Sequence, residues 1–453
     1  MLIENIKTNT ELNDVARLFF GDDVPLISLK IDGNRYTVEY DGAVRVFLYD
    51  GQDYDSIPVE HRVGRLSKIA IYDALCAATG RKMPWGALTG VRPTKLFYEL
   101  LNGGYSHARA TELMQSVYRV EESRACILRR IEYAQRGKVF YPHGYINLYV
   151  HIPFCTTRCS YCSFVSSPID KCREQSHQYV KLLCKEIADA KKILSDSGVK
   201  VLSAYIGGGT PTSLDCADLE AILKAIGDYG CEYTCEAGRP DTINKEKMKL
   251  LRDYGVTRVC VNPQTLCDET LFKIRRRHTA DDFFSAFDTV SSLGFDINCD
   301  LIAGLTDETV EDFAKSFDGI KALNPHNITV HSLSKKNGAA IRYESDENIA
   351  APQMIEYALN NIGAYRPYYL YRQKRQVGNL ENLGLSLPDK ECINNITVME
   401  ETVGVMACGA GAISKVIKDK KISRFADIRD VGQYIARFDE KLSEKNKFFT
   451  ENL

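Results

Sequence analysis

The stretch that decides the fold runs from residue 146 to residue 162 and reads INLYVHIPFCTTRCSYC. Its first seven residues, Ile146–Ile152, are mostly apolar over the length of a strand, which predicts a buried strand. This strand leads into a short loop that carries three cysteines, Cys155, Cys159 and Cys162. The loop is therefore the first place to look for chemistry.

Strand–loop–helix repeats continue beyond this stretch. Apolar segments typical of strands lie at 146–152, 202–206, 233–237, 258–261, 296–302 and 327–332. Helical segments alternate with them at 178–194, 217–226, 245–254, 268–274, 280–293 and 311–323. This alternation predicts an α/β fold with a parallel sheet. We expect the sheet to curl into a partial (β/α)6 barrel of the TIM type, with its site at the carboxyl ends of the strands.

Polar and glycine-rich segments fall at those strand ends. The segment 207–211 reads GGGTP and follows the second predicted strand, and Glu236 ends the third. Residues 262–264 follow the fourth strand, and Asp300 lies in the fifth. Because carboxyl ends of parallel strands meet at one edge of a sheet, we expect these residues to gather near the cysteines.

The remaining chain predicts two flanking domains. Residues 1–140 read as an N-terminal α+β domain, with strands first and helices from about residue 65. The barrel is expected over residues 141–345, and a C-terminal covering domain over residues 346–453. The segment 88–95 predicts a turn into a helix, where Arg92 and Lys95 are either an anion site or a solvated helix start.

Composition narrows the class of protein. The 453 residues are 44% hydrophobic and 26% charged, as in ordinary globular proteins. A formal net charge of −2 does not favour nucleic acid as a partner. We find neither an apolar run of about 18 residues that predicts a membrane span nor the layout of a signal peptide in residues 1–7. These features predict a cytoplasmic protein.

The chain contains fifteen cysteines, which is a high count. A disulfide framework is one interpretation, but the chain is long and most cysteines lie singly in apolar segments. We interpret five of them as reduced, buried small hydrophobes: Cys76, Cys126, Cys184, Cys260 and Cys299. A strongly reducing, oxygen-poor cell would suit this usage.

The CxxxCxxC spacing of the cysteine loop favours an iron–sulfur cluster. Three thiolates from one short loop can bind three irons of a [4Fe–4S] cube, and the fourth iron is left open for a small molecule. A zinc site is the alternative, with His151 as a fourth ligand. The spacing and the lack of a second cysteine pair argue against zinc.

With this spacing the loop resembles the signature of the radical S-adenosylmethionine (SAM) superfamily. In that superfamily the open iron binds SAM, and electron transfer splits its sulfonium bond to give a 5′-deoxyadenosyl radical. The glycine triplet 207–209 alone could be just a tight turn, but it resembles the segment that binds the amino group of SAM. The carboxylate of Glu236 can accept hydrogen bonds from the ribose or the amine.

Further segments resemble the oxygen-independent coproporphyrinogen III oxidase family, which also includes heme chaperones. They are 149–155, 207–211, 262–264 and 276–278. The segments 236–241, 90–95 and 369–374 resemble the coproporphyrinogen dehydrogenase (HemZ-type) branch, which has an additional N-terminal domain.

The resemblance implies a role for individual residues. Tyr149, Gly208 and Glu236 would contact the cluster-bound SAM, and Tyr149 and Glu236 are the catalytic candidates. The oxidases hold a second SAM, which would lie here against Tyr161, Gly209, Thr210, Gln264, Arg276 and Asp300. Without the resemblance, Gln264 and Asp300 could be ordinary polar residues at strand ends.

The function implied is a radical SAM oxidoreductase of heme biosynthesis that converts two propionates of coproporphyrinogen III to vinyl groups by oxidative decarboxylation. Implied partners are the porphyrinogen, or heme, and an electron donor such as flavodoxin or ferredoxin. A heme-binding chaperone and another radical reaction on a porphyrin remain alternatives. The N-terminal domain and the segment 369–374 favour the oxidase.

Substrate contacts are less specific. The basic run Arg275–His278 could pair with propionate carboxylates or form a solvated face. Weaker candidates for the same contact are Arg92, Lys95, Arg372 and Lys374. Four tyrosines could stack on a tetrapyrrole or belong to the core, with the core favoured: Tyr365, Tyr368, Tyr369 and Tyr371.

Overall fold

The chain forms two compact units. The computed structural model describes residues 2–3, 5–90, 92–163, 166–334, 350–373, 379–419 and 421–453. The first unit consists of the described residues within 1–134 and 370–382, and the second unit contains the others. The predicted division into three domains, with boundaries after residues 140 and 345, stays a prediction.

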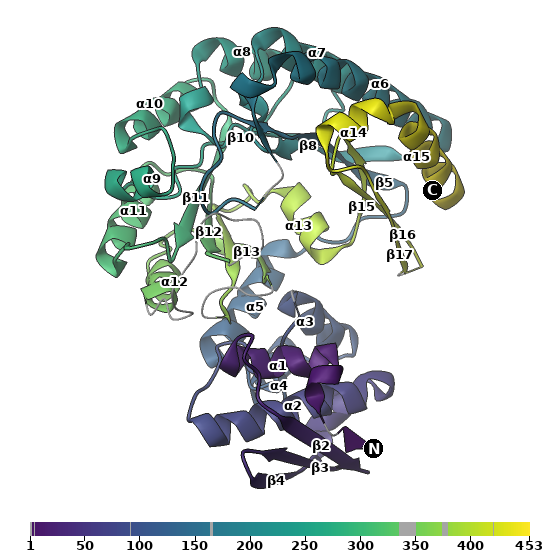
Figure 1. Cartoon of the computed structure of the whole chain (residues 1–453), viewed down its shortest axis with the longest axis vertical. Coiled ribbons are helices and arrows are strands. Elements are labelled where there is room, and N and C mark those ends of the chain that lie inside the picture. Colours follow the sequence, from purple (N-terminus) through teal and green to yellow (C-terminus); the bar gives the residue numbers. More distant parts are fainter. Residues whose placement is uncertain are drawn as a thin grey trace. The chain divides into compact units, whose positions relative to one another are not determined.

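The first unit is an α+β structure on a four-stranded antiparallel sheet (Figure 1). Its strands lie in chain order: β1 Leu2–Ile3, β2 Ile27–Asp32, β3 Arg35–Tyr40 and β4 Ala43–Leu48. Asp41 and Gly42 join β3 to β4 with φ angles of 51° and 69°, as a two-residue hairpin turn requires. The helices are α1 Thr10–Phe20, α2 Val59–Thr79, α3 Pro93–Asn102, α4 His107–Ser116 and α5 Glu122–Gln135.

The second unit contains the predicted parallel strands. Six of them pair side by side in chain order: β5 Tyr145–Ile152, β8 Lys200–Gly208, β9 Glu232–Glu236, β10 Arg258–Cys260, β11 Asp296–Ala303 and β12 Asn327–Ser332. Most of their residues are buried, as expected where a parallel sheet is covered on both faces. All six strands were predicted from apolar runs, with ends that differ by two residues or fewer.

Helices cover the outer side of this curved sheet (Figure 1). They are α6 Arg173–Ser197, α7 Cys216–Ile226, α8 Lys245–Asp253, α9 Asp268–Lys273, α10 Ala280–Ser291 and α11 Val310–Ala322. Two of them start with a reciprocal capping box, Thr279 with Asp282 and Thr309 with Asp312. Such boxes satisfy orphan amides at a helix start, which explains why the sequence placed these starts well.

The C-terminal part of the chain extends the same sheet at both edges. The described strands follow the order β13-β14-β12-β11-β10-β9-β8-β5-β15-β16-β17. The added elements are α12 Ala350–Asn360, β13 Arg366–Tyr371, β14 Asn382–Ser386, α13 Ile393–Glu400, β15 Gly404–Cys408, β16 Ile413–Lys418, β17 Lys421–Ala426, α14 Val431–Ala436 and α15 Phe438–Asn452. Strand β15 pairs parallel with β5, so the strand that leads to the cysteines has a parallel neighbour on each side.

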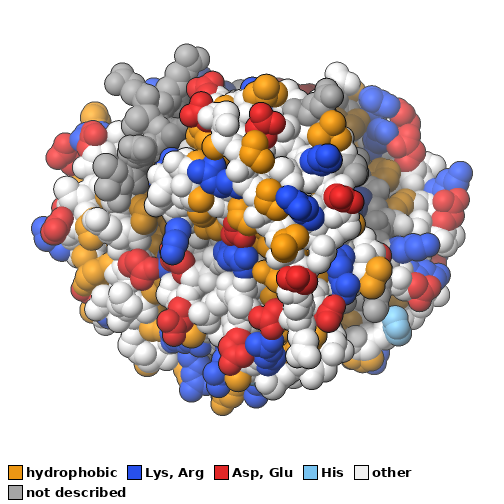
Figure 2. Space-filling view, turned by 90° about the horizontal axis from the view of Figure 1, so that it is seen from below, with side chains coloured by type: hydrophobic (Ala, Val, Ile, Leu, Met, Phe, Trp, Pro, Cys, Tyr) orange, Lys and Arg blue, Asp and Glu red, His pale blue; other side chains and the backbone are white. Residues whose placement is uncertain are grey.

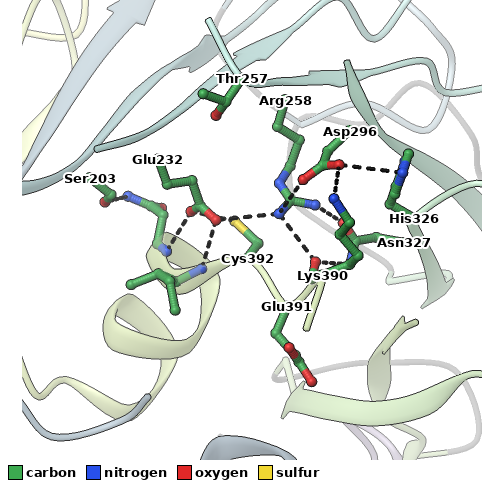
Figure 3. A network of polar contacts seen from close by, with 12 residues as sticks. Ser203, Glu232, Thr257, Arg258, Asp296, His326, Asn327, Lys390, Glu391 and Cys392 are labelled. Atoms are coloured by element: carbon green, nitrogen blue, oxygen red, sulfur yellow. Dashed lines mark hydrogen bonds and ion pairs between the residues drawn. The ribbon is translucent and has the colours of Figure 1, made fainter. Parts of the chain in front are cut away.

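A buried polar network lies at the amino ends of β9–β12 (Figure 3). Glu232, the first residue of β9, accepts hydrogen bonds from the backbone N–H groups of Ile393 (3.1 Å) and Asn394 (3.0 Å). Arg258, the first residue of β10, donates to Glu232 (3.3 Å) and to Asn327. The carboxylate therefore caps the N-terminus of α13, and the site-bearing carboxyl ends of the strands lie at the other end.

The isolated cysteines follow the sequence expectation only in part. Cys260 and Cys299 are buried, Cys76 and Cys184 are half-buried, and none of the five forms a disulfide. Cys126 is exposed, so the prediction that it is buried was wrong. It lies on α5, where helical periodicity turns it outward between the buried Ala125 and Ile127.

Surface and helix properties agree with the composition. On the face drawn in Figure 2, Lys and Arg side chains are interspersed with Asp and Glu side chains. Of the described helices, none combines the length and the apolar character that crossing a membrane requires.

Candidate active site

The cysteine loop lies at the carboxyl end of β5. Cys155 belongs to the short strand β6 (Phe154–Cys155), which pairs with β7 (Ser167–Pro168). The N–H of Ser160 donates to the carbonyl of Ile274 (3.1 Å), so the loop is also tied to the end of α9. Cys159 is buried, whereas Cys155 and Cys162 are partly exposed.

The spacing of the three sulfurs suits a cluster better than a single ion. Among the described residues, three ligand atoms within 4.8 Å of one another occur only in the trio His177, Asp215 and Asp218 on the outer helices. One tetrahedral zinc needs ligands at about 2.0–2.3 Å and so draws them close together. Thiolates on separate corners of an iron–sulfur cube stand farther apart than the ligands of one ion, so a cluster does not require such a close group.

Side-chain donors reach the sulfurs of Cys155 and Cys159. The hydroxyl of Thr210 is 3.5 Å from Sγ of Cys155, and Nη1 of Arg239 is 3.5 Å from Sγ of Cys159. Donors to thiolate sulfur stabilise the negative charge that a cluster brings. The residues present therefore fit a [4Fe–4S] cluster. Arg239 was not a predicted site residue, and only its place in the segment 236–241 pointed to it.

The glycine triplet packs directly against this loop. Gly208 has a φ of 112°, and a Cβ there would lie 2.5 Å from the ring of His151. A Cβ on Gly209 would lie 2.4 Å from the carbonyl oxygen of Phe154 and 2.9 Å from Sγ of Cys155. Side chains are therefore excluded at both positions, which lets this backbone approach the loop and any ligand bound there.

Glu236 ends β9 beside the triplet. Its carboxylate accepts hydrogen bonds from the hydroxyl of Tyr205 (2.7 Å) and the N–H of Gly208 (3.1 Å). Burial raises the pKa of Glu236 to about 7, against these two bonds, which lower it. The ring of Tyr149 stacks on that of Tyr205 with 6.0 Å between centroids. Tyr149, Gly208 and Glu236, predicted as one contact set, lie together; Tyr205 joins them unpredicted.

Arg276 and Tyr161 form a second part of the site. Nη1 of Arg276 donates to the hydroxyl of Tyr161 (2.9 Å). Nη2 donates to the carbonyls of Gly238 and Asn262, both at 2.7 Å. Arg276 is buried, and burial raises the pKa of Tyr161, so both groups face little water.

Asp300 and Gln264 form the third part. Asp300 accepts hydrogen bonds from the side chains of Asn262 (2.8 Å) and Asn298 (2.7 Å). Gln264 donates from its N–H to the Asp300 carbonyl (3.0 Å) and has a φ of 72°, rare for a residue with a side chain. Such a backbone holds only where its surroundings impose it, as they often do at functional sites.

Comparisons with known proteins agree with this geometry. Residues 149–320 match the family model described as the radical SAM superfamily. The oxygen-independent coproporphyrinogen-III oxidase-like protein HemZ of Bacillus subtilis (strain 168) is 36% identical over 398 residues, 83% of this chain and 79% of that protein. The chain belongs to this oxidase-like family of radical SAM proteins. The family resemblance seen in the motifs is thereby confirmed.

Two further known proteins are similar to this chain, one in sequence and one in structure. The heme chaperone HemW of Bacillus subtilis is 33% identical over 198 residues, which are 41% of this chain and 49% of that protein. The solved structure of HemN, coproporphyrinogen III oxidase of Escherichia coli, aligns with a TM-score of 0.55 and 22% identity over 68% of this chain and 72% of that chain. This structural similarity confirms the predicted α/β fold of a radical SAM barrel.

Membership of the superfamily implies a [4Fe–4S] cluster and SAM as cofactors. The weaker candidates for binding a substrate lie in the first unit or outside the described residues. Arg372 is buried in the first unit, where it donates to the carbonyl of Leu88 (2.7 Å) and lies over the ring of Trp85. Arg92 and Lys95 stand at the start of α3 in that same unit, and Lys374 lies outside the described residues.

The other candidates divide by burial. In the basic run, Arg276 and His278 are buried, whereas Arg275 and Arg277 are exposed. Tyr365, Tyr368 and Tyr369 are buried with hydrogen-bonded hydroxyls, which favours the core interpretation. Tyr371 is partly exposed.

Proposed function

We propose that this protein is an oxygen-independent coproporphyrinogen III oxidase that forms protoporphyrinogen IX in heme biosynthesis. One observation carries the proposal: the cysteine loop, the glycine triplet and Glu236 meet at the carboxyl edge of one sheet. The similarity to an oxidase-like relative over 83% of the chain supports the choice of substrate.

In this proposal Cys155, Cys159 and Cys162 hold the cluster and leave one iron for SAM. When bound, the cluster and SAM would supply the radical chemistry that takes one hydrogen from the carbon β to each propionate carboxylate. Each propionate then loses CO2 and one electron, which passes to a one-electron acceptor, and a vinyl group remains. A low-potential electron donor such as flavodoxin or ferredoxin would serve the cluster.

The chain's own residues position the reactants. Glu236 receives the ribose or amine of SAM, since its carboxylate is already oriented by Tyr205 and Gly208. Tyr149 lies beside Tyr205 and covers the same side of the site. These groups are partly buried, which limits the access of water to the radical step.

A second SAM is proposed against Tyr161, Gly209, Thr210, Gln264, Arg276 and Asp300. The hydrogen bonds Arg276–Tyr161 and Gln264–Asp300 support it, because they join these residues pairwise within the second unit.

Arg276 is a weaker candidate for binding a propionate than the sequence indicated. Both of its Nη groups already donate hydrogen bonds to neutral acceptors within the protein.

A heme-binding chaperone is the second candidate. The relative HemW supports it, but that match covers 41% of the chain, against 83% for the oxidase-like relative. Another radical reaction on a porphyrin would give a product other than protoporphyrinogen IX.

The test uses protein that has been reconstituted with iron and sulfide without oxygen. Incubation with SAM, a strong reductant and coproporphyrinogen III should yield protoporphyrinogen IX, measured by chromatography after oxidation to the porphyrin. Cys159→Ala should lose iron, its absorbance and SAM cleavage, whereas Cys184→Ala on α6 should keep them. Stoichiometric heme binding without turnover would instead establish the chaperone.

A further inference from the structure

Arg239 links the cysteine loop to the loop after β9. Its guanidinium is buried, with 4% of the side chain exposed. Nε and Nη2 bind the two carboxylate oxygens of Asp241 at 2.9 and 3.2 Å. Nη1 donates to Sγ of Cys159 (3.5 Å) and to the carbonyl of Thr157 (3.3 Å). One edge of the guanidinium thus binds the carboxylate of Asp241, and Nη1 points to Sγ of Cys159.

Asp241 fixes this arrangement from the other side. It also accepts a hydrogen bond from the hydroxyl of Thr156 (2.9 Å), which belongs to the cysteine loop. The loop is therefore held by both members of a bidentate ion pair, of which the arginine is buried. Arginine is suited to this because its planar fork binds a carboxylate with two donors and keeps others free.

The sulfurs of Cys155 and Cys159 meet different donors. Cys155 receives the neutral hydroxyl of Thr210, but Cys159 receives a cation. In a buried site the field of that cation is weakly screened. Hydrogen bonds to cluster sulfurs and net charge are known to set reduction potentials.

We propose that Arg239 raises the reduction potential of the cluster by stabilising its one-electron-reduced form through the sulfur of Cys159. Reduction adds one electron from a low-potential one-electron donor, and no bond forms or breaks at Arg239. Arg239 is thus a positioning residue that acts through a cluster ligand. The inference rests on the cysteine ligands of the proposed function and is independent of its substrate.

The experiment compares midpoint potentials of reconstituted protein in an anaerobic redox titration followed by electron paramagnetic resonance. Arg239→Gln should keep its iron but give a more negative potential, since the cation is lost. Arg239→Lys should shift it less. Arg252→Gln is the matched control, because Arg252 is an exposed arginine of α8 that lies over the ring of Phe295, and its potential should equal that of the wild type.

A second measurement starts from the wild type and does not depend on a potential. Wild-type protein grown with [15N]arginine should show a nitrogen hyperfine coupling to the reduced cluster in pulsed resonance, and Arg239→Lys should lose it. An iron-loaded Arg239→Gln with the wild-type potential, or a wild type without this coupling, would overturn the inference and leave the proposed function intact. Reconstituted wild type without iron would overturn both.

Discussion

Among single residues, Glu236 is the one whose burial bears most directly on its chemistry, because burial sets its pKa. Its side chain is partly buried at the end of β9, and it accepts two hydrogen bonds that favour the charged form. Burial prevails and raises its pKa to about 7, so the carboxyl group changes charge near neutral pH. A group that must receive an amine or a ribose hydroxyl binds best as the carboxylate.

SAM binding should therefore depend on pH through Glu236. Below a pKa of about 7 the group is protonated, and above it is charged, so affinity should rise about tenfold between pH 6 and pH 8. Calorimetric titration of cluster-loaded protein with SAM measures this. Glu236→Gln should bind more weakly by about 1–3 kcal/mol, and its affinity should not vary with pH in this range. An equal pH dependence in the variant would contradict the assignment.

Between elements, α13 is held by a residue far away in the chain. Glu232 of β9 caps its first amides, and Arg258 of β10 neutralises Glu232. Each is the first residue of its strand. The start of this helix thus depends on the sheet, not on a local cap, and its N-cap residue Cys392 makes no side-chain cap to the helix.

Removal of this cap should destabilise the protein strongly. Glu232→Ala leaves Arg258 buried without its nearest carboxylate partner on β9, which should cost about 3–5 kcal/mol of unfolding free energy. Urea denaturation followed by circular dichroism measures the loss. Glu220→Ala, which removes a surface ion pair with Lys224 on α7, should change stability far less, because water screens exposed ion pairs. Equal effects of the two substitutions would refute this account.

Across the whole molecule, the C-terminal helix α15 belongs to the second unit through a buried charge cluster. Lys445 bonds to Glu186 on α6 and to the carbonyl of Ala407 on β15. Although burial opposes its charge, Glu186 holds the pKa of Lys445 above its ordinary value. The end of the chain is thus tied to the barrel's first helix and to the strand beside β5.

Lys445→Ala should leave Glu186 and the neighbouring Asp427 buried without a cation. We expect a loss of about 3–5 kcal/mol of unfolding free energy and faster proteolysis within α15. Lys447→Ala is the control, because this exposed residue pairs weakly with Glu451 at 3.8 Å. Thermal unfolding of both variants measures the difference in stability. A Lys445→Ala protein as stable as Lys447→Ala would show that the charge cluster does not anchor α15.

Prediction from the sequence worked where the signal was local. Apolar runs and helical periodicity located the six barrel strands β5 and β8–β12 and the helices between them, and the cysteine spacing located the loop. It did not identify the strands β15–β17, which are short and follow one another without helices between them, and it was wrong for Cys126, which helical phase turns outward.

What the sequence determined by itself is the kind of site: three cysteines four and three residues apart, then a glycine triplet and a carboxylate, each at the end of an apolar run. These are short-range patterns, and their chemistry follows from residue type and spacing. Only the tertiary structure decided which side chains surround them. Arg239 beside Cys159, Tyr205 beside Glu236 and Glu232 under α13 join residues 31 to 161 positions apart. Such contacts arise from how the strands stack in the sheet, which no local pattern records.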